Sequence, residues 1–293
     1  MAASPPTRSP STEGLLLIDK PAGVTSHDVV AVARRAIGER RIGHAGTLDP
    51  FATGLLVLLV GRATRLLPYL DGEPKVYQAR IQLGTETDTD DATGRVTRQA
   101  PLPIRADVDA GITALTGAIE QEPPAFSAKQ VEGQRAYAAA RSGTPLTLAP
   151  LRVTVHSWEV TQRANDSIDA IITCSGGTYI RALARDLGRR ASSAAHLAAL
   201  RRTRSGAFSI DDACSFDTLR VGRCALLPPL RAIGSLAVEM LDDTRMQRAL
   251  RGGMVDATVA GPRAALLAPN GDLIAVAVRE GTSWQPRTVL RDA

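Results

Sequence analysis

The sequence lacks any long hydrophobic run. Its longest uninterrupted apolar stretch, residues 55–60, is far shorter than the roughly 20 residues that a helix needs to cross a bilayer. The first residues, MAASPPTRSPST, contain no apolar segment typical of a secretion signal, and their Pro, Ser and Thr content predicts a disordered tail over residues 1–12. We therefore expect a cytoplasmic protein without a membrane span.

Cysteine is also scarce. Cys174, Cys214 and Cys224 form neither a CxxC motif nor a paired framework, and this spacing favours reduced core thiols over disulfides or zinc. The four histidines share no metal-ligand spacing. The sequence therefore predicts no structural metal.

Motifs of common enzyme classes are absent. The sequence contains no GxSxG, HExxH, P-loop or GxGxxG motif, which leaves hydrolase, zinc protease, NTPase and dinucleotide-binding functions without support. The acidic segment 85–94 resembles a calcium loop, but Thr93 and Gln99 stand where such a loop needs Gly and Glu. We expect this segment to be a solvated loop. No ATP, NAD or metal cofactor is predicted.

Only three lysines, Lys20, Lys75 and Lys129, occur among 35 lysine and arginine residues, and the net charge is +5. Arginine guanidinium groups bind phosphate in a fork and stack on bases better than lysine does. The arginine excess favours a nucleic-acid partner. Compositional bias in a GC-rich genome explains the same count, so charge alone does not decide between the two.

The overall composition, 44% hydrophobic and 22% charged, is typical of a soluble globular protein. Hydrophobic periodicity predicts strands at residues 15–18, 55–60, 75–83, 151–160, 168–174, 264–268 and 273–278, the last two joined by a hairpin turn. It predicts helices between Ser26 and Gly38 and at residues 63–70, 107–119, 179–190 and 245–251, and loops at residues 41–54 and 123–133. A composition shift at residues 231–243 marks a boundary before a small β-rich module.

Asp49 lies in an unusual stretch, RIGHAGTLDPFATG, that has neither helical nor strand periodicity. At its ordinary pKa of about 3.9 an aspartate is ionised at neutral pH and can act as a nucleophile, a base or a cation partner. The alternative is that Asp49 stabilises a turn, as Asp before Pro often does.

Arg181 lies in the first turn of the helix predicted at 179–190, for which Thr178 is the expected N-cap. The helix dipole disfavours a cation there by roughly 0.3–1 kcal/mol, so an anion nearby is indicated. Arg185 and Arg189 follow at intervals of four residues, which also fits a solvated basic face. An ion pair with a distant carboxylate or a phosphate is the alternative.

Tyr77 lies on the apolar face of the strand predicted at 75–83. A tyrosine in that place is either part of the core or a platform on which an RNA base stacks.

Five ordered blocks over residues 14–209 closely resemble the bacterial tRNA pseudouridine-55 synthase (TruB) family. They are LLLIDKPAGVTSHDVV, RIGHAGTLDPFATGLL, KVYQARIQLGTETDTDDATG, PPAFSAKQVEGQRAY and CSGGTYIRALARDLG. The resemblance implies conversion of uridine 55 in the T-arm of tRNA to pseudouridine without a cofactor or metal. It also implies an α+β pseudouridine synthase fold, with a mixed, largely antiparallel sheet and flanking helices.

The resemblance assigns roles to individual residues. It implies that Asp49 is the nucleophile, attacking the ribose or first deprotonating it, that Arg181 pairs with Asp49, and that Tyr77 packs on the target base and helps remove its carbon-5 proton. His44 would enter the T-loop and fill the space of the flipped nucleotide, and Leu200 would form the apolar wall of the uracil pocket. Tyr179 matches the tyrosine of the GTYIR block and is a candidate for substrate binding. Lys20 would support the site or contact phosphate. Further candidates for contacts with the RNA backbone are Arg201, Arg202 and Arg204.

These inferences define an expected organisation: a tail over 1–12, a catalytic domain over 13–230 and a PUA-like RNA-binding module over 231–293. The expected protein is a monomer with the tRNA T-arm as its partner and no obligate protein partner. Two alternatives remain. One is a catalytically idle RNA-binding or tRNA-folding protein, and the other is a synthase acting on a ribosomal or messenger stem-loop.

Overall fold

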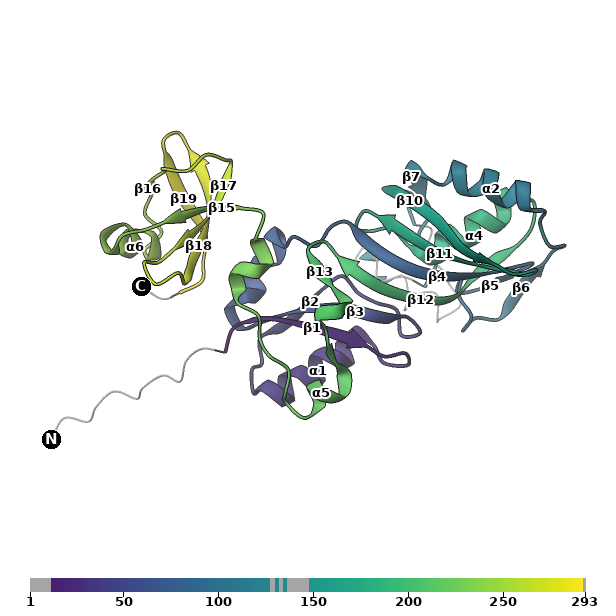
Figure 1. Ribbon diagram of the computed structural model, residues 1–293, viewed down its shortest axis with the longest axis horizontal. Coiled ribbons are helices and arrows are strands. Elements are labelled where there is room, and N and C mark those ends of the chain that lie inside the picture. Colours follow the sequence, from purple (N-terminus) through teal and green to yellow (C-terminus); the bar gives the residue numbers. More distant parts are fainter. Residues whose placement is uncertain (1–11, 127–129, 132–133, 136–147, 292–293) are drawn as a thin grey trace.

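The computed structural model describes residues 12–126, 130–131, 134–135 and 148–291. Within these residues the chain builds a large sheet and a separate smaller sheet near the C-terminus (Figure 1). Residues 1–11 of the predicted tail, and residues 127–129 and 132–133 of the predicted loop 123–133, lie outside the described residues. No helix in the described ranges has the length and apolar character needed to span a membrane.

The large sheet is mixed and largely antiparallel, which confirms the predicted sheet. Its strands are β1 (Gly14–Lys20), β2 (Ile42–Ala45), β3 (Thr53–Val60), β4 (Lys75–Leu83), β7 (Gly117–Gln121), β10 (Leu151–Arg163), β11 (Ser167–Cys174), β12 (Ala195–Ser205), β13 (Phe208–Ser209) and β14 (Cys214–Ser215). The order is β14-β1-β3-β12-β4-β11-β10-β7, with β2 on β3 and β13 on β12. Only the β1–β14 and β3–β12 pairs among these strands are parallel.

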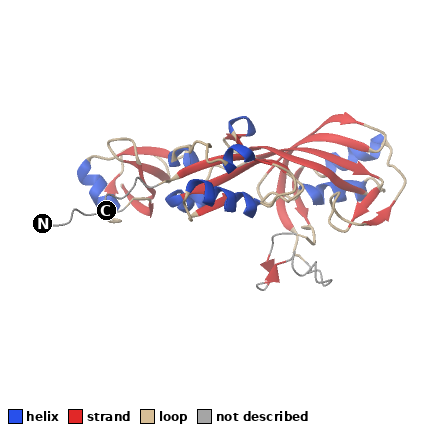
Figure 2. Cartoon of the chain, turned by 90° about the horizontal axis from the view of Figure 1, so that it is seen from below, coloured by secondary structure: helices blue, strands red, loops and turns tan. Residues whose placement is uncertain are grey.

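Helices cover the sheet and enclose its main hydrophobic core (Figure 2). The α-helices are α1 (Ser26–Ile37), α2 (Arg105–Ala114), α4 (Ile180–Arg190) and α5 (Phe216–Arg220), and the 3₁₀ helices are η1 (Gly61–Tyr69), η2 (Ile210–Asp212) and η3 (Pro229–Ile233). Helix α4 has an apolar stripe of Ile180, Leu183, Ala184 and Leu187, and its burial explains why this helix lies against the sheet. Two short hairpins, β5 (Thr85–Thr87) with β6 (Val96–Gln99) and β8 (Gln130–Val131) with β9 (Gln134–Arg135), complete this part.

Several local predictions need correction. The helix predicted between Ser26 and Gly38 includes Ser26 in its first turn, and its N-cap is Thr25, because Thr25 and Asp28 form a reciprocal capping box. The predicted loop 41–54 contains β2, which pairs with β3 along its full length. Helix α2 ends at Ala114, and the chain then enters β7 within the range predicted as helix. The predicted strand over 75–83 is confirmed, including the alternating burial of its side chains.

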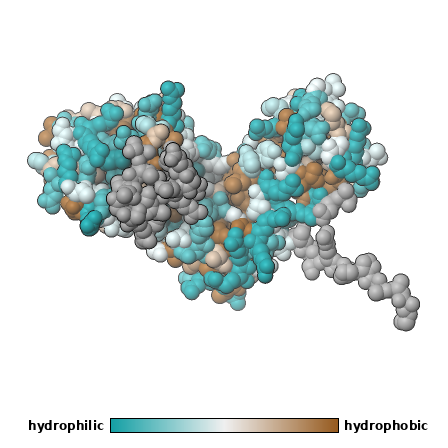
Figure 3. All heavy atoms as spheres, turned by 180° about the vertical axis from the view of Figure 1, so that it is seen from behind, coloured by the Kyte–Doolittle hydropathy of each residue, from teal (hydrophilic) through white to brown (hydrophobic). Residues whose placement is uncertain are grey.

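The smaller sheet contains β15 (Ala237–Met240), β16 (Val255–Asp256), β17 (Arg263–Leu267), β18 (Leu273–Glu280) and β19 (Ser283–Val289), with α6 (Asp243–Leu250) packed against it. The predicted β17–β18 hairpin is confirmed. Hydrogen bonds from η1 attach this sheet to the rest of the protein, since Arg62 Nη1 donates to the Leu290 carbonyl at 3.0 Å. The space-filling view from behind shows two lobes with a notch between them (Figure 3).

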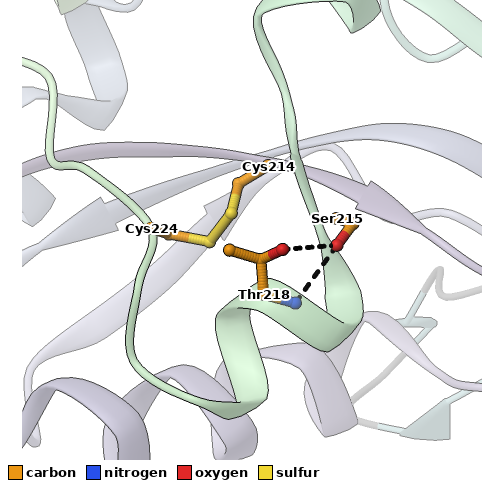
Figure 4. Close-up of a disulfide and its surroundings, with 4 residues drawn as sticks. All are labelled: Cys214, Ser215, Thr218 and Cys224. Atoms are coloured by element: carbon orange, nitrogen blue, oxygen red, sulfur yellow. Dashed lines mark hydrogen bonds between the residues drawn. A yellow bond between two sulfur atoms is a disulfide. The ribbon is translucent and has the colours of Figure 1, made fainter.

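The prediction of three reduced thiols is wrong for two of the cysteines. Cys214 and Cys224 form a disulfide, drawn in Figure 4. Ten residues separate them, but α5 turns the chain back and brings their Cα atoms to 5.8 Å, a distance that a disulfide can bridge. Cys174 is a buried free thiol, as predicted, and burial raises its pKa to about 11.

Candidate active site

A cavity of about 200 Å³ lies where β4, β12 and the N-terminal end of α4 meet the segment that contains Asp49. Six of the site residues proposed from the sequence line this cavity although they are up to 153 positions apart in the chain. They are Asp49, Tyr77, Tyr179, Arg181, Leu200 and Arg202. The sheet register explains part of this convergence, because Leu200 on β12 is paired with Ala79 on β4, two residues from Tyr77.

The backbone on each side of Asp49 is anchored. On the N-terminal side, the buried Ser26 hydroxyl donates to the Leu48 carbonyl at 3.1 Å and accepts from the Leu48 amide at 3.0 Å. On the C-terminal side, the Pro50 carbonyl accepts from Gly23 N at 2.8 Å and from Lys20 Nζ at 3.3 Å. These contacts fix the segment that carries the carboxylate against β1 and α1.

Arg181 and Asp49 form a bidentate ion pair. Arg181 Nε donates to Asp49 Oδ2 at 2.9 Å, and Nη2 donates to Oδ1 at 3.0 Å. The Arg181 side chain is 5% exposed and that of Asp49 34% exposed, so the guanidinium is buried behind a carboxylate that still faces the cavity. Asp49 supplies the anion that a first-turn arginine requires. Thr178 does not cap the helix, because Tyr179 is the N-cap and has no side-chain capping bond.

The remaining donors of Arg181 hold it in place. Nη1 donates to the Thr89 carbonyl and Nη2 to the Phe126 carbonyl, each at 2.9 Å. Asp91 Oδ2 lies 3.6 Å from Nη1, and its side chain is 6% exposed. Since a guanidinium has five N–H donors in a rigid plane, these partners fix the direction in which the fork faces Asp49.

The acidic segment is not a solvated loop as predicted. Glu86, Asp90 and Asp91 are buried because each faces an arginine of α4. The corresponding arginines are likewise not a solvated basic face, since the side chains of Arg181 and Arg185 are 5% and 9% exposed. Arg189, which pairs with Glu86, is the one of the three that remains half-exposed.

Tyr77 and Leu200 form apolar walls of the cavity, at 6% and 8% exposure. Burial raises the pKa of the Tyr77 phenol, so the phenol stays neutral at physiological pH. Tyr179 is held by its backbone, because Gln121 Oε1 accepts from its amide at 2.8 Å and Gln121 Nε2 donates to its carbonyl at 3.1 Å.

Two candidate residues lie outside the cavity lining. His44 lies on β2, where its ring meets His27 edge-on at 5.5 Å between centroids. Burial and the nearby His27 lower the pKa of His44, which favours a neutral imidazole. Lys20 is fully buried and donates to the carbonyls of Pro21 at 2.9 Å and Val24 at 2.8 Å.

Lys20 therefore has no exposed surface for the phosphate contact considered from the sequence. Its ammonium group instead stabilises the loop carbonyls to which it donates. Burial, which outweighs the attraction of Asp49, lowers the pKa of Lys20 to about 8.

Of the three arginines of β12 expected to contact the RNA backbone, Arg202 needs correction. Arg202 is fully buried, and its guanidinium donates to the carbonyls of Leu55 at 2.7 Å and Gly46 at 2.9 Å. Arg201 forms a bidentate pair with Asp19 at 3.0 and 2.7 Å. Arg204 remains exposed.

Lys75 lines the cavity and was missed by the sequence analysis. A Cβ built on Gly46 would lie 3.1 Å from its ammonium nitrogen, which shows how closely the lysine approaches the segment before Asp49. Burial and the neighbouring Arg202 lower the pKa of Lys75. Its position two residues before Tyr77 on the same strand face was the available signal.

Across the described ranges, no group of three or more His, Cys, Asp or Glu side chains is arranged to hold a metal ion.

Solved structures share this fold. A chain of the archaeal box H/ACA sRNP Nop10-Cbf5 complex superposes with a TM-score of 0.69 at 21% identity, covering 95% of this chain and 86% of that chain. A chain of an H/ACA RNP bound to a substrate RNA containing 2′-deoxyuridine gives the same TM-score at 20% identity, covering 95% of this chain and 85% of that one.

Sequence comparison identifies the enzyme class and then the family. Residues 34–180 match the family model of the TruB family pseudouridylate synthase N-terminal domain, so the protein is a pseudouridine synthase, an isomerase that acts on RNA. A tRNA pseudouridine synthase B of Thermobifida fusca is 46% identical over 94% of this chain and 98% of its own length. One from Nocardia farcinica is 43% identical over 99% and 97%. The chain belongs to the TruB family.

Proposed function

We propose that this enzyme converts uridine 55 in the T-arm of tRNA to pseudouridine, with Asp49 as its nucleophile. The relatives named tRNA pseudouridine synthase B support tRNA as the substrate. The observation that carries the proposal is the Arg181–Asp49 pair, in which a buried guanidinium holds a carboxylate toward a cavity of about 200 Å³.

The proposed reaction is an isomerisation in which all atoms are conserved. The bond between uracil N1 and ribose C1′ breaks, the base rotates, and a bond forms between C5 and C1′, while the proton on C5 is lost and N1 gains one. Asp49 acts on the ribose, either by attacking C1′ or by removing a proton from the sugar. Both routes need an ionised carboxylate with a fixed direction, which a bidentate guanidinium supplies.

The target base must leave its stack to reach Asp49. Extruding a nucleotide costs a few kcal/mol, which contacts with the extruded base offset. Tyr77 and Leu200 provide the apolar walls for those contacts. We assign Tyr77 to packing on the base, because its ring is buried in the cavity wall. We propose that His44 enters the T-loop where the base has left, as a neutral imidazole.

We further propose that residues 13–230 form the catalytic domain and residues 231–293 a PUA-like module that binds RNA. The five-stranded sheet with α6 has its own hydrophobic core, which supports a separate module. The net charge of +5 favours phosphate contacts. Affinity should then weaken with salt, by roughly 0.7–0.9 log units per phosphate contact for each tenfold rise.

The test is to incubate the protein with a T-arm stem-loop and detect pseudouridine by carbodiimide labelling. We expect label at the position equivalent to uridine 55. No label with well-folded protein that binds the RNA would favour an idle RNA-binding protein instead. Mapping the product across total RNA separates the tRNA substrate from a ribosomal or messenger stem-loop, because a label outside tRNA alone would overturn the proposed substrate.

A further inference from the structure

Three ion pairs join α4 to the acidic segment after β4. Arg185 Nη1 donates to Asp90 Oδ2 at 2.9 Å, and Arg189 Nη2 lies 2.9 Å from Glu86 Oε2. The third is the 3.6 Å contact between Arg181 and Asp91. Because residues four apart lie on one helix face, the three arginines form a row that runs away from the cavity.

The middle pair is buried on both sides, whereas in the outer pair the carboxylate of Glu86 is buried and its arginine is exposed. The side chains of Arg185 and Asp90 are 9% and 12% exposed, whereas Arg189 is 52% exposed. A solvent-exposed pair contributes little to stability, but removing one partner of a buried pair leaves an uncompensated charge. Burial raises the pKa of Asp90 and Arg185 opposes that shift, so the Asp90 carboxylate depends on the arginine for its charge.

Asp90 connects this pair to the active site through its chain neighbours. Thr89 supplies the carbonyl that accepts from Arg181 Nη1, and Asp91 supplies the nearby carboxylate. Asp90 itself has φ of 59°, a left-handed conformation that a residue with a side chain adopts at a cost. A segment in such a conformation needs contacts that hold it, and Arg185 provides the side-chain contact.

Arg185 also reaches a second segment that touches Arg181. Its Nη2 donates to the Glu122 carbonyl at 2.9 Å, four residues before Phe126, whose carbonyl accepts from Arg181. The same guanidinium therefore holds both stretches of backbone that orient Arg181.

We propose that Arg185 and Asp90 are a positioning pair for catalysis: they fix the backbone carbonyls that aim the Arg181 guanidinium at Asp49. Neither residue lines the cavity, and both side chains are buried, so their effect on Asp49 passes through Arg181. The inference rests on the proposed catalytic role of Asp49.

The test compares Asp90→Asn with Glu86→Gln in the full-length protein, with a T-arm stem-loop as substrate. Both substitutions neutralise a carboxylate that faces α4 from the same segment, so the second is the matched control. We expect Asp90→Asn to lower kcat by about 10- to 100-fold with KM close to that of wild type, because small misplacements of catalytic groups have effects of this size. Glu86→Gln should stay near wild type.

A second pair of variants separates positioning from loss of folding. Arg185→Met should lower kcat at least as much as Asp90→Asn, because it also removes the donor to the Glu122 carbonyl, and the double variant should lose no more than Arg185→Met alone. Arg185→Lys, which keeps the charge, should recover part of the rate. Thermal unfolding of each variant identifies any that fails to fold. If Arg185→Met does not fold, the kcat of Arg185→Lys is compared with that of Glu86→Gln instead.

Two results would overturn the inference. One is an Asp90→Asn rate equal to that of Glu86→Gln, and the other is a proportional loss of kcat and binding in every folded variant. Either would leave the proposed function intact as long as the wild-type protein forms pseudouridine and Asp49→Asn does not. Absence of product from the wild-type protein would instead contradict the proposed function.

Discussion

Replacing Arg181 with methionine should remove most turnover while leaving T-arm affinity close to that of the wild-type protein. The substitution keeps an unbranched apolar stem and deletes the fork that contacts Asp49 at 2.9 and 3.0 Å. Loss of a preorganised charge contact of this kind costs roughly 10²–10³ in kcat, equivalent to about 2.7–4 kcal/mol of transition-state stabilisation. The effect on binding is expected to be small because Arg181 is 5% exposed.

The same substitution has a cost for stability that the assay must separate from chemistry. It leaves the Asp91 carboxylate, 6% exposed, without its nearest cation. Breaking a buried ion pair destabilises a protein by roughly 3–5 kcal/mol, so thermal unfolding must confirm that the variant is folded at the assay temperature. Arg181→Lys, which keeps the charge but loses the bidentate geometry, is the control. Its turnover should lie between that of the wild-type protein and that of Arg181→Met.

Single-turnover pseudouridine formation measures the chemical rate, and filter binding of the T-arm stem-loop measures affinity, so the two assays together separate chemistry from binding. The reasoning is refuted if folded Arg181→Met forms pseudouridine at the wild-type rate. A tenfold or larger loss of affinity with an unchanged chemical rate would equally contradict it.

Three further outcomes are expected. Lys20→Met should reduce the urea-measured free energy of unfolding by roughly 1–3 kcal/mol, because buried carbonyls lose their donor, and an unchanged value would contradict the structural place of Lys20. His44→Ala should slow modification of a folded T-arm more than that of a short single strand carrying the same uridine, and equal losses would remove its role in extrusion. Glu239 is buried, which would raise its pKa, but hydrogen bonds from Arg245, Trp284 and Thr258 lower it from 4.5 to about 2. Its stabilisation is therefore complete above pH 4.5 and lost as pH falls toward 2, so Glu239→Gln should flatten the acid side of a thermal stability profile.

Local pattern was enough to predict the strands and helices that carry the site. The apolar stripe of α4 determined which face of the helix is buried, and the position of Arg181 in the first turn required an anion. The GTLDP and GTYIR blocks, compared with the family, indicated Asp49 as that anion. The structure brings the two side chains into bidentate contact.

The errors concern partners that are distant in the sequence. The acidic segment looks solvated on its own, and its burial depends on arginines about 95 positions later. Arg202 and Lys20 carry charges that usually indicate exposure, but both are buried and donate to backbone carbonyls. Cys214 and Cys224 meet only because α5 reverses the chain between them. Such contacts depend on the tertiary arrangement, and no short stretch of sequence predicts them.

The most direct test of the proposed chemistry is the Asp49→Asn variant, because it keeps the size of the side chain and removes only its negative charge. We predict that it binds the T-arm stem-loop with wild-type affinity and forms no pseudouridine in a single turnover. Pseudouridine formed at the wild-type rate by this variant would contradict the central claim that the Asp49 carboxylate acts on the ribose.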